Sequence, residues 1–275
     1  MTQPPPTPAP LRLEARVLAS RNEGGPQHRL VLGVPGWRGF GPGQFAMLSP
    51  GARASVPRSD PLLPRPMAIY RARARGGAAE VEILYKVCGR GTALLAEALP
   101  GQRVGFVGPL GRAFPAPAPG ERALLLGGGT GIASLYELAA RLAPAAPVTV
   151  LFGARSAADL MGTEDFAALA VELRIATEDG SRGARGLATA LLEAALAEGG
   201  PACVYACGPT PMMRRAAELA RARGSRCLVS LENHMACGFG VCLGCAAPRA
   251  GGGFALVCRD GPMFEAGALA WEGLA

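Results

Sequence analysis

Four cysteines near the end of the chain constrain what it can fold into more than any other feature of the sequence. Their spacing is C-x4-C-x2-C, then twelve residues, then C, which is the ligand arrangement expected for a plant-type [2Fe–2S] cluster. Glycines between them allow positive φ and bring backbone N–H groups close to the sulfurs, where hydrogen bonds tune a cluster. The predicted ligands are Cys237, Cys242, Cys245 and Cys258. A chain with such a site is expected to move electrons.

A structural zinc site is the alternative, since it also uses four cysteines. Zinc sites usually consist of two short C-x2–4-C knuckles separated by a longer spacer. Here three cysteines share one glycine-rich loop and Cys258 follows the strand-like run FALV, so the spacing favours iron and sulfur. His234, three residues before Cys237, is interpreted as a loop residue rather than a Rieske-type ligand, because four cysteines already suffice.

Composition narrows the classes of function. The net charge is +7, but the basic residues are almost all arginines spread among Ala, Gly and Pro, and aromatic residues make up only 5% of the chain. No basic stripe with stacking aromatics is present, which argues against nucleic-acid binding. No apolar run reaches the roughly 18 residues that a membrane span needs. The opening MTQPPPTPAP lacks an apolar signal region and the other cysteines are scattered, so a cytoplasmic protein is expected.

The first part of the chain is predicted to be a small antiparallel β-barrel. Residues 1–10 are a proline-rich tail that we expect to be disordered. From 11 to 114, short and often alternating segments are separated by Gly or Pro, with one helix at 92–99 and a turn-rich loop at 50–64. Strands are expected over residues 11–20, 28–35, 43–50, 65–74 and 78–87.

The pattern changes after a proline-rich linker at 115–120. Strands then alternate with helices, which predicts an α/β domain with a parallel sheet over 120–225. Beyond the helix that follows the first strand, helices are expected from about Ser156, at 187–198 and at 211–223. Residues 226–275 are assigned to the cysteine module. The predicted fold class is therefore multidomain: a barrel, a parallel-sheet nucleotide domain and a small [2Fe–2S] module.

Two loops of the α/β domain are candidates for binding a nucleotide. The run GGGTG at 127–131 joins a buried strand to a helix, where backbone N–H groups and the positive helix end favour phosphate. It departs from the usual dinucleotide fingerprint because Ile132 stands where a third glycine is needed, and such turns also occur for packing alone. The run CGP at 207–209 ends another strand, so both loops are expected at one edge of the sheet. The alternative for Cys207 is a small buried residue.

The runs RPMAIY (65–70) and KVCGRGT (86–92) are the informative parts of the barrel. Arg65 carries a planar, always charged fork that suits phosphate. Gly89, Gly91 and Thr92 open a predicted helix whose N–H groups could take a pyrophosphate. Taken alone, these runs favour an ordinary surface arginine at position 65 and a simple glycine turn.

Taken together and in this order, the barrel, RPMAI, GGGTGIAS and CGP resemble the ferredoxin–NADP reductase superfamily. The C-terminal C-x4-C-x2-C…CRDGPMF closely resembles the electron-transfer subunits of class 1B dihydroorotate dehydrogenases, and the resemblance covers about residues 11–270. It implies FAD in the barrel, NADH on the second domain, and a cluster that relays electrons to FMN in a separate catalytic subunit. It implies an assembly of two copies of each subunit and no orotate site on this chain.

The resemblance also implies roles for individual residues. It places Arg65, Pro66, Met67 and Ala68 along FAD. It places Gly89, Gly91 and Thr92 at the FAD pyrophosphate, with Lys86 as a further cofactor-binding position. It places Gly127, Gly129, Thr130 and Gly131 against the nicotinamide nucleotide, with Gly208 and Pro209 as further positions. Cys207 would lie near the hydride-transfer path, and Glu178, Asp179 and Gly180 would face the nucleotide ribose.

Ala68 departs from the related chains, which usually carry serine or threonine there. A backbone N–H would then have to replace the hydroxyl that hydrogen-bonds the flavin ring. Between the two coenzymes we expect NADH, since Glu178 and Asp179 would repel the 2′-phosphate of NADPH, although Arg155 and Ser156 could meet one.

Two other functions fit parts of the pattern. A subunit of a sulfide dehydrogenase or of an NAD(P)H–ferredoxin oxidoreductase would share the barrel and the nucleotide domain. A zinc-stabilised, non-catalytic partner protein on a reductase-like scaffold would share the four cysteines. The intact cysteine set and the CRDGPMF run favour the dihydroorotate dehydrogenase family.

Overall fold

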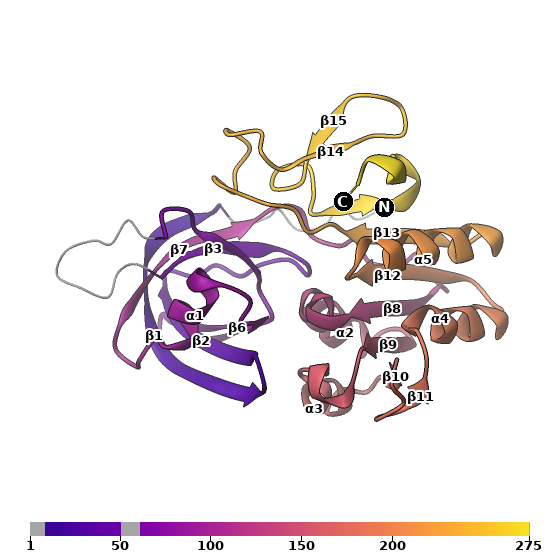
Figure 1. The fold of residues 1–275 in the computed structure, drawn as a ribbon, viewed down its shortest axis with the longest axis horizontal. Coiled ribbons are helices and arrows are strands. Elements are labelled where there is room, and N and C mark those ends of the chain that lie inside the picture. Colours follow the sequence, from indigo (N-terminus) through magenta and orange to yellow (C-terminus); the bar gives the residue numbers. More distant parts are fainter. Residues whose placement is uncertain (1–8, 51–60, 275) are drawn as a thin grey trace.

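The computed structural model describes residues 9–50 and 61–274 and consists of three packed units. Residues 1–8 of the expected disordered tail and most of the expected loop at 50–64 lie outside the described residues. Figure 1 shows a barrel-like sheet beside a parallel sheet with helices, and a small module above them. In the part of the chain that is described, no helix combines the length and the apolar character that crossing a membrane requires.

The first unit is a seven-stranded antiparallel sheet that curls into a half-barrel. Its strands run in the spatial order β4-β3-β7-β1-β2-β6-β5. They are β1 (Leu11–Gly24), β2 (Gln27–Pro35), β3 (Phe45–Ser49), β4 (Arg65–Ala68), β5 (Arg71–Arg75), β6 (Ala78–Lys86) and β7 (Arg103–Leu110), with α1 (Arg90–Ala96) before β7. Alternating apolar residues such as Leu30, Leu32 and Val34 point inward and are fully buried, as the period-2 pattern predicts.

The expected strand at 65–74 is two strands, because the chain crosses from one side of the half-barrel to the other. At the crossing, the Ile69 N–H donates to the Gln44 carbonyl at 3.1 Å, next to β3. The following Tyr70 N–H donates to the Glu82 carbonyl on β6 at 2.9 Å. These two bonds bring the two edges of the sheet together, which a strand pattern alone does not reveal.

The second unit is a parallel sheet with helices on both faces. Its order is β11-β10-β9-β8-β12-β13-β16, in which β16 pairs antiparallel with β13 and the other neighbouring strands pair in parallel. Its strands are β8 (Arg122–Gly128), β9 (Val148–Ala154), β10 (Glu172–Thr177), β11 (Ala184–Arg185), β12 (Ala202–Cys207), β13 (Arg226–Ser230) and β16 (Met263–Glu265). Its helices are α2 (Tyr136–Leu142), α3 (Thr163–Ala167), α4 (Ala188–Ala197) and α5 (Thr210–Ala222).

Alternate residues of the central strands supply two separate cores, which is why both faces carry helices. Leu124 and Leu126 of β8 pack with residues of α4 and α5, whereas Leu125 packs with residues of α2 and α3. The helix expected from about Ser156 is a short 3-10 turn at Ala157–Asp159 followed by α3. The break occurs because Leu160 is extended and Gly162 has a φ of +65°.

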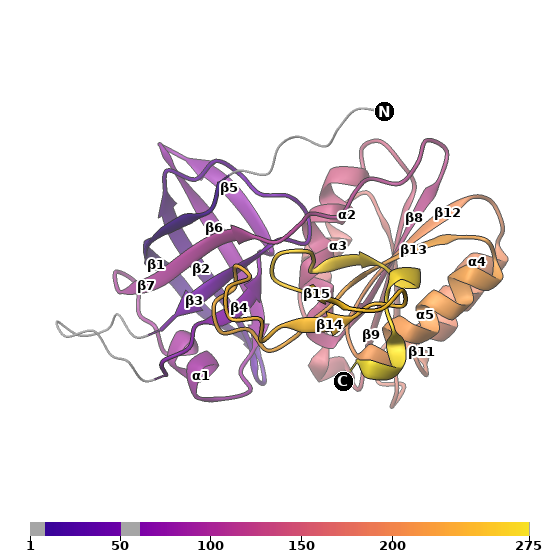
Figure 2. The same cartoon turned by 90° about the horizontal axis from the view of Figure 1, so that it is seen from above.

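The third unit holds the four cysteines. It contains β14 (Ala246–Pro248) and β15 (Phe254–Leu256), and its β16 pairs with β13 of the parallel sheet. The sequence pattern places residues 226–230 in this module, whereas in the structure they form β13 and pair with β12 in parallel. The module therefore starts after Ser230. In Figure 2, which looks down on it, the module lies over the junction between the other two units.

Candidate functional site

The cysteine loop is built on glycines and packs against the half-barrel. Gly238 and Gly240 have φ values of +83° and +90°, in the left-handed region that glycine tolerates best. A Cβ at Gly238 would overlap the Met47 side chain of β3. Cys245 and Cys258 share a continuous apolar core with Met47 and Leu110. The loop is thus held directly on the barrel strands.

The four thiols come together as two pairs. The sulfurs of Cys245 and Cys258 lie 3.2 Å apart and both residues are buried, while Cys237 and Cys242 interact through their side chains nearer the surface. Within residues 9–50 and 61–274, no three His, Cys, Asp or Glu side chains form a group suited to one metal ion. A [2Fe–2S] cluster takes two thiolates on each of its two irons, which fits two pairs of thiols. A structural zinc ion would instead need all four thiols around one metal ion.

The loop backbone favours a thiolate at Cys237. Burial opposes ionisation, but backbone N–H groups of Cys242, Phe239 and Val241 outweigh it and lower the pKa of the Cys237 thiol to about 6. The Phe239 N–H lies 3.5 Å from the Cys237 sulfur. Thiolates are the form that binds metals, so the donor set fits an iron–sulfur cluster.

The two glycine-containing loops of the nucleotide domain meet at one sheet edge, which confirms the expectation. Gly127 of β8 and Cys207 of β12 are paired in register at the carboxyl ends of neighbouring strands. A Cβ at Gly131 would overlap the Cys207 carbonyl and approach the Gly208 nitrogen within 2.7 Å. Close approach of two backbones, rather than a helix start alone, therefore requires glycine at 131.

A cavity of about 890 Å³ lies between this edge and the half-barrel. Gly128, Gly129 and Thr130 line it from one loop, Gly208 and Pro209 from the other, and Lys86 and Gln27 from the barrel. The Lys86 ammonium pairs with Asp159 at 3.2 Å, and Gln27 donates to the Ala158 carbonyl at 2.6 Å. The cavity thus joins residues of both domains, as a site for hydride transfer between two bound groups requires.

Cys207 is placed behind this cavity rather than in it. Its side chain is fully buried, and its sulfur lies 3.6 Å from the Ser134 hydroxyl. Burial raises the pKa of the Cys207 thiol to about 12, so it stays neutral. The side chain therefore matches the alternative of a small buried residue, and only the backbone of Cys207 reaches the loop edge.

The two runs of the barrel come together at the start of α1. A Cβ at Gly91 would overlap the Arg65 guanidinium, so the arginine lies directly over the glycine. The Thr92 hydroxyl accepts from the N–H groups of Cys88 and Gly89 at 3.0 and 3.1 Å and donates to the Gly89 carbonyl. Thr92 therefore holds the turn by accepting the Cys88 and Gly89 N–H groups, and the Arg65 guanidinium beside the turn offers the charged donors that suit a pyrophosphate.

Other predicted positions divide between the two sites. Met67 is buried in the barrel core, whereas Pro66 and Ala68 are partly exposed on β4. Glu178 lines the cavity, but Asp179 turns away and accepts from the Ser181 N–H and hydroxyl at 3.0 and 2.6 Å. Arg155 also lines the cavity, and the Ser156 hydroxyl donates to Asp159 at 3.1 Å.

Glu232 and Gln27 are cavity residues that the sequence analysis missed. Glu232 follows β13, and its exposed side chain lines the cavity. Neither lies in a motif, so no local signal marks them. Gln27 is found only because β2 begins there, at the end of the barrel that meets the nucleotide domain.

Comparisons with known proteins agree with this geometry. Residues 232–270 match the family model "iron–sulfur cluster binding domain of dihydroorotate dehydrogenase B", and residues 125–218 match "oxidoreductase NAD-binding domain". A solved structure of an NADH-dependent reduced ferredoxin-NADP oxidoreductase superposes with a TM-score of 0.82 at 26% identity, covering 94% of this chain and 91% of that chain. A ferredoxin NADP+ reductase from Neisseria gonorrhoeae shares the fold, with a TM-score of 0.61 at 17% identity over 78% of this chain and 92% of that chain.

The fold and the paired thiols define a reductase of the ferredoxin–NADP reductase type that carries an iron–sulfur module. Its sequence is 42% identical over 232 residues to the dihydroorotate dehydrogenase B (NAD(+)) electron transfer subunit of Bacillus caldolyticus, covering 82% of this chain and 85% of that protein. It is 35% identical over 265 residues to the dihydroorotate dehydrogenase B (NAD(+)) electron transfer subunit of Listeria monocytogenes, covering 93% of this chain and 98% of that protein. The chain belongs to the family of dihydroorotate dehydrogenase B electron transfer subunits.

Proposed function

We propose that this chain passes electrons from NADH, by way of FAD and a [2Fe–2S] cluster, to the FMN of a dihydroorotate dehydrogenase catalytic subunit in pyrimidine biosynthesis. The observation that carries the proposal is that the paired thiols and the nucleotide cavity both lie against the same half-barrel. A flavin supplies the conversion between a two-electron hydride and the single electrons that such a cluster accepts.

The chain's own residues bind and orient these groups. Arg65 with the Gly89–Thr92 turn is proposed to hold the FAD pyrophosphate, and β4 to line the flavin. The loops at 127–131 and 207–209 are proposed to hold NADH across the cavity from Lys86. The four cysteines are proposed to hold the cluster, with one iron for each thiol pair. No side chain needs to act as a general base, and Cys207 contributes through its backbone.

Exposed apolar side chains on the cysteine loop itself support a docking role for it. Phe239, Val241 and Leu243 are 56%, 74% and 63% exposed although each is apolar. Apolar groups gathered at one place on a surface mark a protein contact. We propose that the catalytic subunit covers them in a complex of two copies of each subunit, in the cytoplasm.

Replacing Val241 with aspartate is expected to raise the Kd of the complex with the catalytic subunit by about 10-fold or more. This is the effect typical of mutating a residue that is buried in an interface. Leu99→Asp is the matched control, because Leu99 is 62% exposed on the barrel, away from the cysteine loop. Affinity is measured by analytical ultracentrifugation or biolayer interferometry, with iron content determined for each variant. Equal affinities for both variants would place the interface elsewhere.

Coenzyme choice is expected to depend on Glu178. Its carboxylate lines the cavity and repels a 2′-phosphate, so Glu178→Gln should raise the use of NADPH relative to NADH by roughly 10-fold. Asp179→Asn is the control, since that carboxylate is engaged by Ser181. The check is the ratio of kcat/KM values for the two coenzymes. A ratio that responds to Asp179 and not to Glu178 would contradict this assignment.

The proposed function is tested by reconstituting the chain with a dihydroorotate dehydrogenase catalytic subunit. We expect the complex to reduce NAD+ with dihydroorotate, and each subunit alone to fail. The superposition on a ferredoxin-NADP oxidoreductase favours one alternative, in which the acceptor is a ferredoxin. NADH-dependent reduction of ferredoxin without any catalytic subunit would support that alternative instead.

A further inference from the structure

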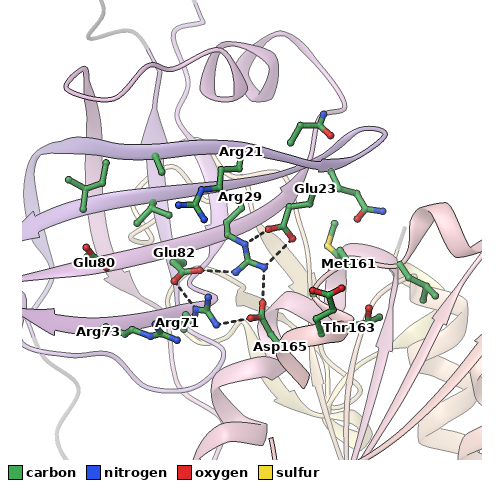
Figure 3. A pocket seen from close by; sticks show the side chains of 18 of the residues that line it. Arg21, Glu23, Arg29, Arg71, Arg73, Glu80, Glu82, Met161, Thr163 and Asp165 are labelled. Carbon is green, nitrogen blue, oxygen red and sulfur yellow. Dashed lines mark hydrogen bonds and ion pairs between the residues drawn. The ribbon is translucent and has the colours of Figure 1, made fainter. Parts of the chain in front are cut away.

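A second group of charged side chains joins the half-barrel to the nucleotide domain, outside the cavity described above. It borders a hollow of about 940 Å³. The barrel contributes Glu23, Arg29, Arg71 and Glu82, and helix α3 contributes Asp165. Figure 3 shows Arg29 directed at Glu23, Glu82 and Asp165. Arg71 is directed at Glu82 and Asp165.

Asp165 connects the two domains through three hydrogen bonds, in addition to the Lys86–Asp159 and Gln27–Ala158 contacts described above. Its Oδ2 accepts from Arg29 Nη2 at 2.7 Å and from the Tyr70 hydroxyl at 2.9 Å. Its Oδ1 accepts from Arg71 Nη1 at 2.9 Å. Three donors from β2, β5 and the β4–β5 crossing thus converge on one carboxylate from α3. Among the described residues, Asp165 is the one acceptor in this group that the nucleotide domain supplies.

The stacked rings of Tyr70 and Tyr136 connect the Asp165 contacts to both proposed binding sites. Tyr70 lies two residues after Ala68, at the end of the run proposed to line FAD. Its ring stacks on Tyr136 with centroids 4.4 Å apart. Tyr136 begins α2, which follows the 3-10 helix Gly129–Leu135 that starts within the glycine loop proposed to bind NADH. Gly162 leaves room for the Tyr70 hydroxyl, because a Cβ there would lie 2.7 Å from it.

Asp165 and its two arginine donors are charged at neutral pH. Burial opposes ionisation of Asp165, but the hydrogen bonds from Arg29 and Tyr70 and the two positive charges hold its pKa below the ordinary value. Burial and the Asp165 charge raise the pKa of Tyr70, so its hydroxyl remains a donor. Charge-assisted hydrogen bonds of this kind have defined geometry and resist displacement.

The barrel does not need Asp165 for its own charge balance. Arg29 also donates to Glu82 at 2.7 Å and pairs with Glu23, and Arg71 pairs with Glu82 at 2.7 Å. Removing the Asp165 carboxylate therefore leaves both arginines with acidic partners inside the barrel. What is lost is the link to α3.

We infer that Asp165 is a positioning residue, which fixes the nucleotide domain against the barrel and so sets how closely bound NADH approaches the flavin. This inference rests on the proposed function. Displacement of reacting groups by about 1 Å, caused far from the chemistry, can slow a reaction by about 100-fold. We therefore expect loss of the carboxylate to slow flavin reduction by NADH about 10- to 100-fold.

The test is anaerobic stopped-flow reduction of the FAD- and cluster-containing protein by NADH, with Asp165→Ala and the isosteric Asp165→Asn. Glu80→Ala is the matched control, because Glu80 borders the same hollow but pairs with Arg75 within the barrel. Hydrogen–deuterium exchange of residues 65–72 and 160–167 reports the loosened contact independently of activity. Oxidation of the dithionite-reduced protein by ferricyanide, which needs no nucleotide, reports the remaining electron path.

We expect both Asp165 variants to reduce more slowly at saturating NADH and to exchange faster at these segments, with ferricyanide oxidation, FAD and iron contents as in the wild type. Glu80→Ala should match the wild type throughout. If Asp165→Asn is reduced as fast as the wild type, the inference is wrong while the proposed function stands. If NADH does not reduce the wild-type flavin, the proposed function fails and the inference with it.

Discussion

Replacing Cys258 with serine is expected to abolish cluster binding and to leave the flavin reducible by NADH. Cys258 forms the buried pair with Cys245, so its loss removes one of two ligands from one proposed iron position. Mutating a group that only supports a metal ligand lowers metal affinity or activity about 10- to 100-fold, and losing a ligand lowers them further. Electron transfer to the catalytic subunit should therefore fall by more than about 100-fold.

Cys227→Ala is the matched control for this prediction. Cys227 is also buried, but it lies on β13 in the parallel sheet, and burial raises the pKa of its thiol to about 12. Iron content, the EPR signal of the reduced protein and NADH-driven flavin reduction are measured for both variants. A Cys258→Ser protein that keeps a full iron content and normal transfer to the partner would remove Cys258 from the ligand set.

Gly131→Ala is expected to disable the nucleotide site while leaving both other cofactors bound. The added Cβ would overlap the Cys207 carbonyl and crowd the Gly208 nitrogen. These are backbone atoms of a central strand end, so they cannot rotate away as a side chain would. Overpacking of this kind costs about 1–3 kcal/mol of folding stability. It should also separate the two loops that line the cavity and weaken NADH binding by about 10-fold or more.

Gly251→Ala provides the control, because a Cβ there meets nothing within 4 Å. The measurements are NADH affinity, FAD and iron contents, and the midpoint of thermal unfolding. The half-barrel has its own core, so FAD should remain bound. Unchanged NADH affinity in Gly131→Ala would show that the two loops do not act as one binding edge.

The sequence predicts the elements of this fold well because local patterns determine them. Alternating residues in β2 and β6 identify strands, and the glycine run at 127–131 marks the end of a buried strand. The cysteine spacing is equally local, since three of the four residues share one loop. Placing both nucleotide loops at one edge required only the rule that parallel strands end together.

The sequence does not reveal the direction in which a side chain points or the contacts between residues far apart in the chain. Period-2 alternation decides which way Cys207 points, and in the structure it points into the core. Asp165 lies 136 residues from Arg29 and 94 from Arg71, so no spacing connects them. The arginines themselves are indistinguishable from the many others in this arginine-rich chain. The sequence pattern does not show that residues 226–230 continue the parallel sheet, because only the pairing of β13 with β12 reveals it.

Visible and EPR spectra of the anaerobically purified protein, recorded before and after adding NADH, test the central claim most directly. We predict flavin bands over a broad iron–sulfur absorption, bleaching of these bands with NADH, and the EPR signal of a reduced [2Fe–2S] cluster. Flavin that bleaches without any iron signal would leave a reductase and remove the cluster. A colourless protein with one zinc per chain would contradict the electron-transfer function altogether.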